Sequence, residues 1–342
     1  MTDVSILQLV WFLLIGILFI GYAILDGFDL GVGALHLFVR NDTDRRININ
    51  AIAPVWDGNE VWLLTGGGAL FAAFPKAYAT IFSSFYLALV LLLTGLIFRA
   101  VSMEFRSKVD SQSWRKVWDI AFAFGSIVPS IIYGVAVGNL VRGIPLNSQQ
   151  IFTGTFLGLL NPYAILCGIL SLIMFTLHGA IYLIGKTEGE HSKSMAKTAL
   201  RCWFIYSVML VLVIVATFIS APNVSEKLLS RSLFYLSLVL LLASTLYIPV
   251  TLQAQKCFQA FLASSTSIAS LLLIAGVGLF PQLVPSLSDH AHSLSASQAS
   301  ASEYTLKVMT IIASIGMPLV LCYTIIIYRI FKGKVVLNDS SY

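Results

Sequence analysis

Long apolar runs alternate along this chain with short stretches where polar residues gather. Nine of the runs hold about 20 residues, which lets a helix cross roughly 30 Å of hydrocarbon. The first run has no basic segment before it and no small-residue cleavage site, so we expect a retained helix and not a signal peptide. The pattern predicts nine transmembrane helices, at about Ile6–Leu25, Ala51–Phe74, Ala77–Phe98, Val117–Val141, Pro162–Ile184, Cys202–Ile219, Leu233–Leu252, Cys257–Phe280 and Val308–Ile330.

The composition also indicates an all-α integral membrane protein. Hydrophobic residues make up 58% of the 342 residues and charged residues 11%, whereas a soluble protein has about 25% charged residues. The net charge of +5 comes from basic residues placed between the apolar runs, so we expect membrane lipid and no nucleic acid as a partner. No soluble domain remains between the helices, and we interpret residues 1–342 as a single transmembrane domain. The four cysteines have no C-x-x-C spacing, which argues against a thiolate metal site.

The distribution of Lys and Arg predicts the orientation. With the N-terminus outside, 16 of the 21 basic residues fall in the cytoplasmic loops and the C-terminal tail. The five on the outer side are Lys76, Arg142, Lys227, Arg231 and Lys307. Cytoplasmic loops of membrane proteins carry the excess of positive residues. We therefore expect the N-terminus outside and the C-terminus in the cytoplasm.

Four carboxylates stand where two successive helices meet the cytoplasmic boundary. The first predicted helix ends in "DGFD", with Asp26 and Asp29, and the second begins in "WDGNE", with Asp57 and Glu60. Each pair is three residues apart, which places its members on one helical face. Arg99 closes the third predicted helix on the same side. The sequence therefore predicts a cluster of acidic side chains at this boundary.

Two interpretations compete for this cluster. In the first, the carboxylates cap helix ends or pair with Arg99 and the loop arginines. In the second, partly buried carboxylates take and release protons, since charged groups at membrane depth are expensive and often mark a proton path. We favour the proton path for Asp57 and Glu60, because they lead directly into an apolar helix, and both interpretations stay open for Asp26 and Asp29.

Other polar features are weaker signals. The "TGGG" of Thr65 to Gly68 predicts close helix packing or room for a small molecule to pass. His178 is the one histidine inside a predicted helix, and it could ligate haem, carry a proton or make a packing hydrogen bond. A second axial ligand at similar depth is missing from the sequence, so we expect this chain to bind no haem.

The loop 281–305 contains "DHAH" and "SLSASQASASE", and we expect it to be flexible and without a metal.

Several long motifs resemble subunit II of the cytochrome bd quinol oxidase family. They are "GYAILDGFDLGVGAL", "RNDTDRRININAIAPVWDGNEVWLLTGGGALFAAFP", "YLALVLLLTGLIFRAVSMEFRSK" and "TLHGAIYL". The resemblance is continuous over about the first 185 residues, and the number of helices and the length agree to the end.

The resemblance implies a function. Members of the family oxidise quinol and reduce dioxygen to water in the bacterial cytoplasmic membrane, with haem b and haem d carried by subunit I and a small accessory subunit in some complexes. Subunit II is the haem-free, multi-pass partner, beside which protons enter from the cytoplasm. On this resemblance Asp57 matches an aspartate of the proton path, Asp26 and Asp29 match the "DGFD" pair, and Trp62 matches a tryptophan beside the route for oxygen.

Two other classes of function fit parts of the pattern. A stand-alone proton-coupled transporter would explain the carboxylates and the glycine-rich helix, but transporters commonly contain internal repeats, and none is evident here. A purely structural subunit would tolerate the substitution Asp57→Asn with little loss of oxygen consumption.

Overall fold

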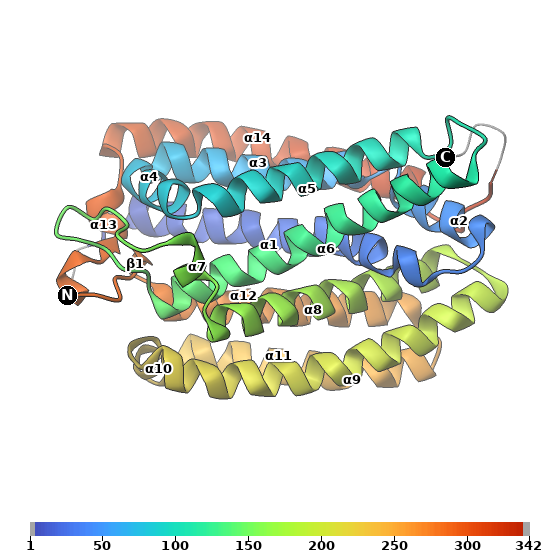
Figure 1. Cartoon of the computed structure of the whole chain (residues 1–342). Coiled ribbons are helices and arrows are strands. Elements are labelled where there is room, and N and C mark those ends of the chain that lie inside the picture. The colour runs from blue at the N-terminus through green and yellow to red at the C-terminus, as the bar shows by residue number, and fades with distance from the viewer. Residues whose placement is uncertain (1–3, 338–342) are drawn as a thin grey trace.

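The computed structural model describes residues 4–337 as one bundle of helices that run side by side (Figure 1). Polar side chains start many of the helices: Ser5 accepts a hydrogen bond from the Gln8 backbone in a capping box, and Asn161 precedes a helix with proline at its first position. The helices are α1 (Ile6–Leu35), η1 (His36–Phe38), α2 (Asp42–Ile52), α3 (Trp56–Ala73), α4 (Pro75–Ser84), α5 (Tyr86–Phe105), α6 (Gln112–Arg142), α7 (Phe156–Leu159), α8 (Pro162–Lys186), α9 (Gly189–Ser220), α10 (Pro222–Leu229), α11 (Ser232–Gln253), α12 (Cys257–Leu279), η2 (His290–His292), α13 (Ala296–Ala299) and α14 (Glu303–Ile330).

Eight helices within residues 4–337 are long and apolar enough to cross a membrane: α1 together with η1, α5, α6, α8, α9, α11, α12 and α14. They correspond to eight of the nine predicted runs. The remaining run corresponds to α3, which has 18 residues but carries Asp57, Asn59 and Glu60 near its start. The predicted sides of the chain ends also concern residues 1–3 and 338–342, which lie outside the described residues.

The structure corrects several of the predicted boundaries: α9 begins at Gly189 and not near Cys202, and two further corrections concern α1 and the run that ends at Phe98. Helix α1 continues ten residues beyond Leu25, so Asp26 and Asp29 lie inside a helix and not at its end. The run predicted from Ala77 to Phe98 is divided at Phe85 into α4 and α5. These differences arise because a run of apolar residues reports burial in lipid and not where the backbone continues or breaks.

Helix α1 lies at the centre of the bundle, packed against α3, α6 and α8. Its contact with α8 depends on glycine: a Cβ atom on Gly31 would lie 1.8 Å from the carbonyl oxygen of Phe175. A similar close approach joins α5 to α6, where a Cβ atom on Gly125 would lie 2.4 Å from the carbonyl oxygen of Gly95 and 2.6 Å from the amide nitrogen of Arg99. Close approach at small residues is the usual way that membrane helices pack.

The "TGGG" of α3 contributes less to packing than its sequence predicts. A Cβ atom on Gly66 would contact the ring of Phe19 at 3.1 Å, but Cβ atoms on Gly67 and Gly68 would meet nothing within 4 Å in the described chain. Close packing is therefore confirmed at Gly66, and Gly67 and Gly68 make no such contact within residues 4–337.

The segment that follows α12 is ordered, and the prediction of a flexible loop was wrong. Strand β1 (Gln282–Val284) pairs antiparallel with β2 (Leu294–Ser295), and α13 follows directly. Val284 and Leu294 are fully buried, and the amide of Ala301 donates to the carbonyl of Ala73 at the end of α3. Small serine and alanine side chains, which gave the sequence its low complexity, allow this close packing.

Helix α14 is attached to the bundle mainly near its two ends. Near its start, the indole nitrogen of Trp11 donates to the carbonyl of Leu306 at 3.1 Å, and Leu306 is the one buried residue of this helix. Near its end, the hydroxyl of Tyr328 donates to Asn59 of α3, and Lys334 donates to carbonyl oxygens at the end of α8. The middle of α14 exposes a row of large apolar side chains.

Candidate functional site

A buried group of polar side chains joins α1, α3, α5 and α6. We call it the Arg99 cluster, and its members are Tyr22, Asp26, Glu60, Arg99 and Tyr133. The Nη2 atom of Arg99 lies 2.7 Å from Oδ1 of Asp26 and 3.1 Å from Oε2 of Glu60, and Nη1 donates to Oδ2 of Asp26 at 3.0 Å. Arg99 and Asp26 are fully buried. A single guanidinium thus holds two of the predicted carboxylates.

The backbone explains why Arg99 can reach both carboxylates. The glycine contact described above presses α5 onto α6 beside the amide of Arg99. Asp26 is buried because α1 continues as a helix past it, and Glu60 lies one turn into α3. The arginine side chain then spans the interior between helices, where a planar guanidinium bonds two acceptors at once.

Asp29 lies close by but has different partners. Its Oδ2 atom accepts a hydrogen bond of 2.8 Å from the side-chain amide of Asn59, which also donates to the carbonyl of Leu25. The Asn59 oxygen accepts from the hydroxyl of Tyr328. The second oxygen of Asp29 is buried and has no hydrogen-bond partner within residues 4–337. Asp29 is therefore held by a neutral amide, whereas Asp26 is held by a guanidinium.

The structure separates the remaining predicted residues. Asp57 is exposed in the first turn of α3, where a negative charge suits the positive end of the helix dipole. The side chain of Glu60 is 21% exposed and connects this surface to the buried cluster. Trp62 is buried against Tyr22 and Leu18, with its ring over Gly21. The predicted clustering is therefore confirmed for Asp26 and Glu60, with Asp29 on a separate branch and Asp57 at the surface.

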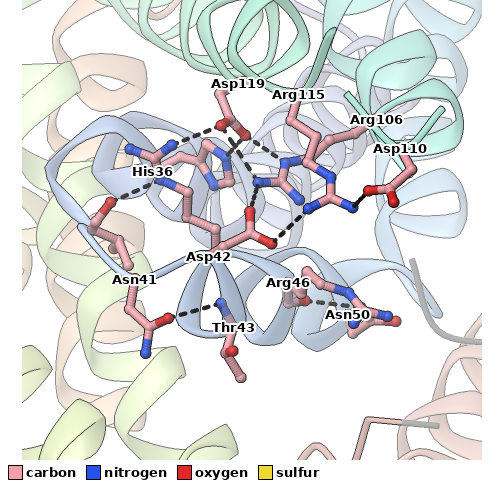
Figure 2. Close-up of polar contacts among 12 residues, drawn as sticks. His36, Asn41, Asp42, Thr43, Arg46, Asn50, Arg106, Asp110, Arg115 and Asp119 are labelled. Carbon is pink, nitrogen blue, oxygen red and sulfur yellow. Dashed lines mark hydrogen bonds and ion pairs between the residues drawn. The ribbon is translucent and has the colours of Figure 1, made fainter. Parts of the chain in front are cut away.

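A second polar group lies at the α2 end of the bundle (Figure 2). In this Asp119 cluster, the carboxylate of Asp119 contacts Nε2 of His36 at 2.5 Å, Nη1 of Arg45 at 2.7 Å and Nε of Arg106 at 2.5 Å. Arg106 also pairs with Asp42 at 2.5 Å. Burial alone would lower the pKa of Arg106, but its hydrogen bonds to Asp119 and Asp42 outweigh burial and raise the pKa. The cluster fixes the segment between α1 and α2 against the start of α6.

The sequence interpretation did not single out the Asp119 cluster. Asp119 begins a predicted apolar run and has no acidic or basic neighbour at helical spacing inside that run. Its partners come from η1, α2 and the end of α5, so only the folded chain brings them together. An aspartate at the edge of a membrane helix was the available signal.

The comparisons with known proteins connect these features to a family. A family model described as cytochrome bd terminal oxidase subunit II matches residues 7–331. The chain is also 39% identical to the cytochrome bd-I ubiquinol oxidase subunit 2 of Escherichia coli strain K12, over 99% of this chain and 98% of the relative. This chain belongs to the cytochrome bd oxidase subunit II family.

A second relative and a solved structure agree with this result, the first in sequence and the second in fold. The cytochrome bd ubiquinol oxidase subunit 2 of Bacillus subtilis is 35% identical over 95% of this chain and 96% of its own length. A chain in the structure of the bd oxidase from Geobacillus thermodenitrificans has the same fold, with a TM-score of 0.80, 16% identity and coverage of 96% of this chain and 99% of that chain. The sequence resemblance to the family is thus confirmed.

The histidines of this subunit II family member already have partners. His178 is fully buried, its Nδ1 atom lies 2.7 Å from the hydroxyl of Ser264, and its Nε2 atom lies 3.1 Å from the carbonyl of Ile24. In the loop, His292 contacts the carbonyl of Leu146. Within residues 4–337, no three His, Cys, Asp or Glu side chains are grouped to hold a metal ion.

Proposed function

We propose that this chain is the haem-free subunit II of a bd-type oxidase, which oxidises quinol and reduces dioxygen to water in a bacterial cytoplasmic membrane. Membership of the subunit II family and the names of the relatives, which are ubiquinol oxidase subunits, support this proposal. The partner is subunit I, which carries haem b and haem d, and a small accessory subunit can complete the complex. The apolar surfaces of the helices face lipid and the partner.

We also propose nine membrane crossings, with α3 as the ninth. Helix α3 runs from the α2 end of the bundle to the end where α4, α13 and β1 lie, parallel to the long helices (Figure 1). Counting α3, the crossings are odd in number, so α1 starts and α14 ends on opposite sides of the membrane. The distribution of Lys and Arg assigns the start of α1 to the outer side.

The proposed role of this subunit is to support the haem subunit and to admit protons from the cytoplasm. The observation that carries the proton path is the bridge that Arg99 makes between Glu60 and Asp26. Burial increases along this line, from the exposed Asp57 through Glu60, 21% exposed, to the fully buried Asp26. Two carboxylates, Asp26 and Glu60, share the one guanidinium of Arg99, so with both ionised the cluster carries one negative charge in excess, which a proton would neutralise.

The residues of this chain fit a haem-free subunit. Both ring nitrogens of His178 lie within hydrogen-bond distance of protein oxygens, so axial ligation of haem would cost one of these bonds. The role of Trp62 beside an oxygen route remains a prediction from the resemblance.

The experiment is coexpression with the haem-bearing subunit, followed by purification in mild detergent. We expect the two subunits in a one-to-one ratio and quinol-driven oxygen uptake. In the variant Asp26→Asn, we expect oxygen uptake per haem to fall about tenfold or more, since a positioned proton-transfer group contributes about 10²-fold to 10⁴-fold to a rate. Purification of a monodisperse and active single subunit would contradict the proposed function.

A further inference from the structure

The Arg99 cluster has a second branch that leads away from Glu60. The hydroxyl of Tyr22 donates a hydrogen bond of 2.8 Å to Oδ2 of Asp26. The same hydroxyl oxygen lies 2.6 Å from the hydroxyl of Tyr133, which comes from α6. Four groups therefore stand in one continuous line from Arg99 through Asp26 and Tyr22 to Tyr133.

This branch extends toward the middle of the bundle. Tyr22 precedes Asp26 by four residues, which is one helical turn and about 6 Å along α1. The turn lies on the side of Asp26 away from the α2 end. Tyr22 is buried against Trp62 and Leu18, and Tyr133 is half-buried with its ring edge-on to that of Tyr22 at 5.3 Å between centroids. The two hydroxyls are thus the polar groups that continue inward from the buried ion pair.

The other branch, through Asp29, is chemically different. Asp29 is held by the side-chain amide of Asn59, whose nitrogen donates to Asp29 and whose oxygen accepts from Tyr328. An amide has fixed donors and a fixed acceptor, so it cannot exchange a proton in the way that a hydroxyl does. A hydroxyl both donates and accepts, and its proton rotates between partners. The branch through Tyr22 and Tyr133 is the one built from groups that can pass a proton on.

We infer that Tyr22 and Tyr133 carry protons onward from Asp26, so that the inner part of the relay runs to α6. When Asp26 takes up a proton, the hydroxyl of Tyr22 turns from Asp26 to Tyr133, and the proton of Asp26 then points at the oxygen of Tyr22. Asp26 gives this proton to Tyr22, Tyr22 gives its own hydroxyl proton to the oxygen of Tyr133, and Tyr133 releases its hydroxyl proton to a water molecule. Each phenol gains one proton and loses one, so neither is left charged and no electron moves. Rotation of the two hydroxyls restores the starting arrangement.

This inference rests on the proposed function, because it needs a complex that consumes protons. The test compares Tyr22→Phe and Tyr133→Phe in membranes that contain the complete oxidase. The matched control is Tyr206→Phe, because Tyr206 is a buried tyrosine of α9 whose hydroxyl lies 2.8 Å from that of Ser267, outside the Arg99 cluster. The measurements are quinol-driven oxygen uptake per haem in H₂O and in D₂O, together with haem content.

We expect both relay variants to keep normal haem content and to lose about tenfold or more in oxygen uptake per haem, with a larger solvent isotope effect. The Tyr206→Phe variant should behave like the unmodified complex. Normal turnover in both relay variants would overturn the inference, and so would loss of assembly in both, which would mark the hydroxyls as structural. Asp26→Asn separates the failure of the relay from the failure of the proposed function. If it slows turnover at normal haem content while the tyrosine variants do not, the proposed function stands and only the relay to α6 fails.

Discussion

The guanidinium of Arg99 and the carboxylate of Asp26 form a fully buried ion pair, with Nη2 2.7 Å from Oδ1. Removing the cation in Arg99→Ala leaves Asp26 as an uncompensated buried charge, so we expect a loss of about 3–5 kcal/mol in stability. Thermal unfolding of the purified complex measures it. The control is Lys307→Ala, which removes an exposed ion pair with Glu303 and should change little. Equal stability of the two variants would count against a structural role of the buried pair.

Substitutions of Asp57 and Glu60 in α3 should have similar effects on activity but different effects on stability. If Asp57 and Glu60 hand protons inward, Asp57→Asn and Glu60→Gln both lower oxygen uptake per haem, by about tenfold or more. Asp57→Glu should retain more activity, because it still carries a proton. Only Glu60→Gln should also lower the melting temperature, since Glu60 contacts Arg99. Unchanged turnover per haem in Asp57→Asn would remove Asp57 from any obligatory path.

The contact between α1 and α8 predicts opposite effects for two glycines of the same helix. A Cβ atom on Gly31 would meet the carbonyl of Phe175 at 1.8 Å, whereas one on Gly16 would meet nothing within 4 Å. We expect Gly31→Ala to lower stability by about 1–3 kcal/mol or more, because the overpacked helices must separate. Gly16→Ala should be neutral or slightly stabilising. Melting curves of both complexes test this. The packing described would be contradicted if Gly16→Ala lowered the melting temperature and Gly31→Ala did not.

Asp119 should matter for stability and not for turnover. Asp119→Asn leaves His36, Arg45 and Arg106 around a neutral amide, so we expect a loss of about 3–5 kcal/mol. The segment between α1 and α2 should then become sensitive to protease added from the side of the membrane on which α2 lies. Asp110→Asn is the control, since that carboxylate is almost fully exposed and pairs with Arg115. A protease-resistant Asp119→Asn variant with unchanged melting would show that the cluster is dispensable.

His178 should be a packing residue. In the purified complex, His178→Ala should leave the haem content per complex unchanged, as measured from the optical spectrum. Stability should fall by about 1–3 kcal/mol, because Ser264 and the carbonyl of Ile24 lose a buried partner. Haem bands that disappear in this variant would mean that the chain binds haem.

The residues differ in how much their sequence context revealed. Asp26 and Glu60 could be placed together from helical spacing and the order of the helices, and Arg99 was a natural partner on the same side. Tyr22 stands four residues before Asp26, so the contact between these two residues could also be predicted from helical spacing. The contact between Tyr133 and Tyr22 could not, because it depends on the packing of α6 on α1. The exposure of Asp57 could not be predicted from the sequence, since the spacing of apolar residues does not tell which face of α3 turns outward.

Helix α14 holds to the bundle through Trp11 near one end and through Tyr328 and Lys334 near the other. On the side of the bundle, these contacts are made by Trp11 of α1, Asn59 of α3 and carbonyl oxygens at the end of α8, and these helices leave the ribosome long before α14 does. Helix α14 can therefore join the bundle only after these earlier helices have been synthesised and inserted. In a nascent chain that ends before α14, the surfaces of α1 and α3 that α14 contacts would be uncovered.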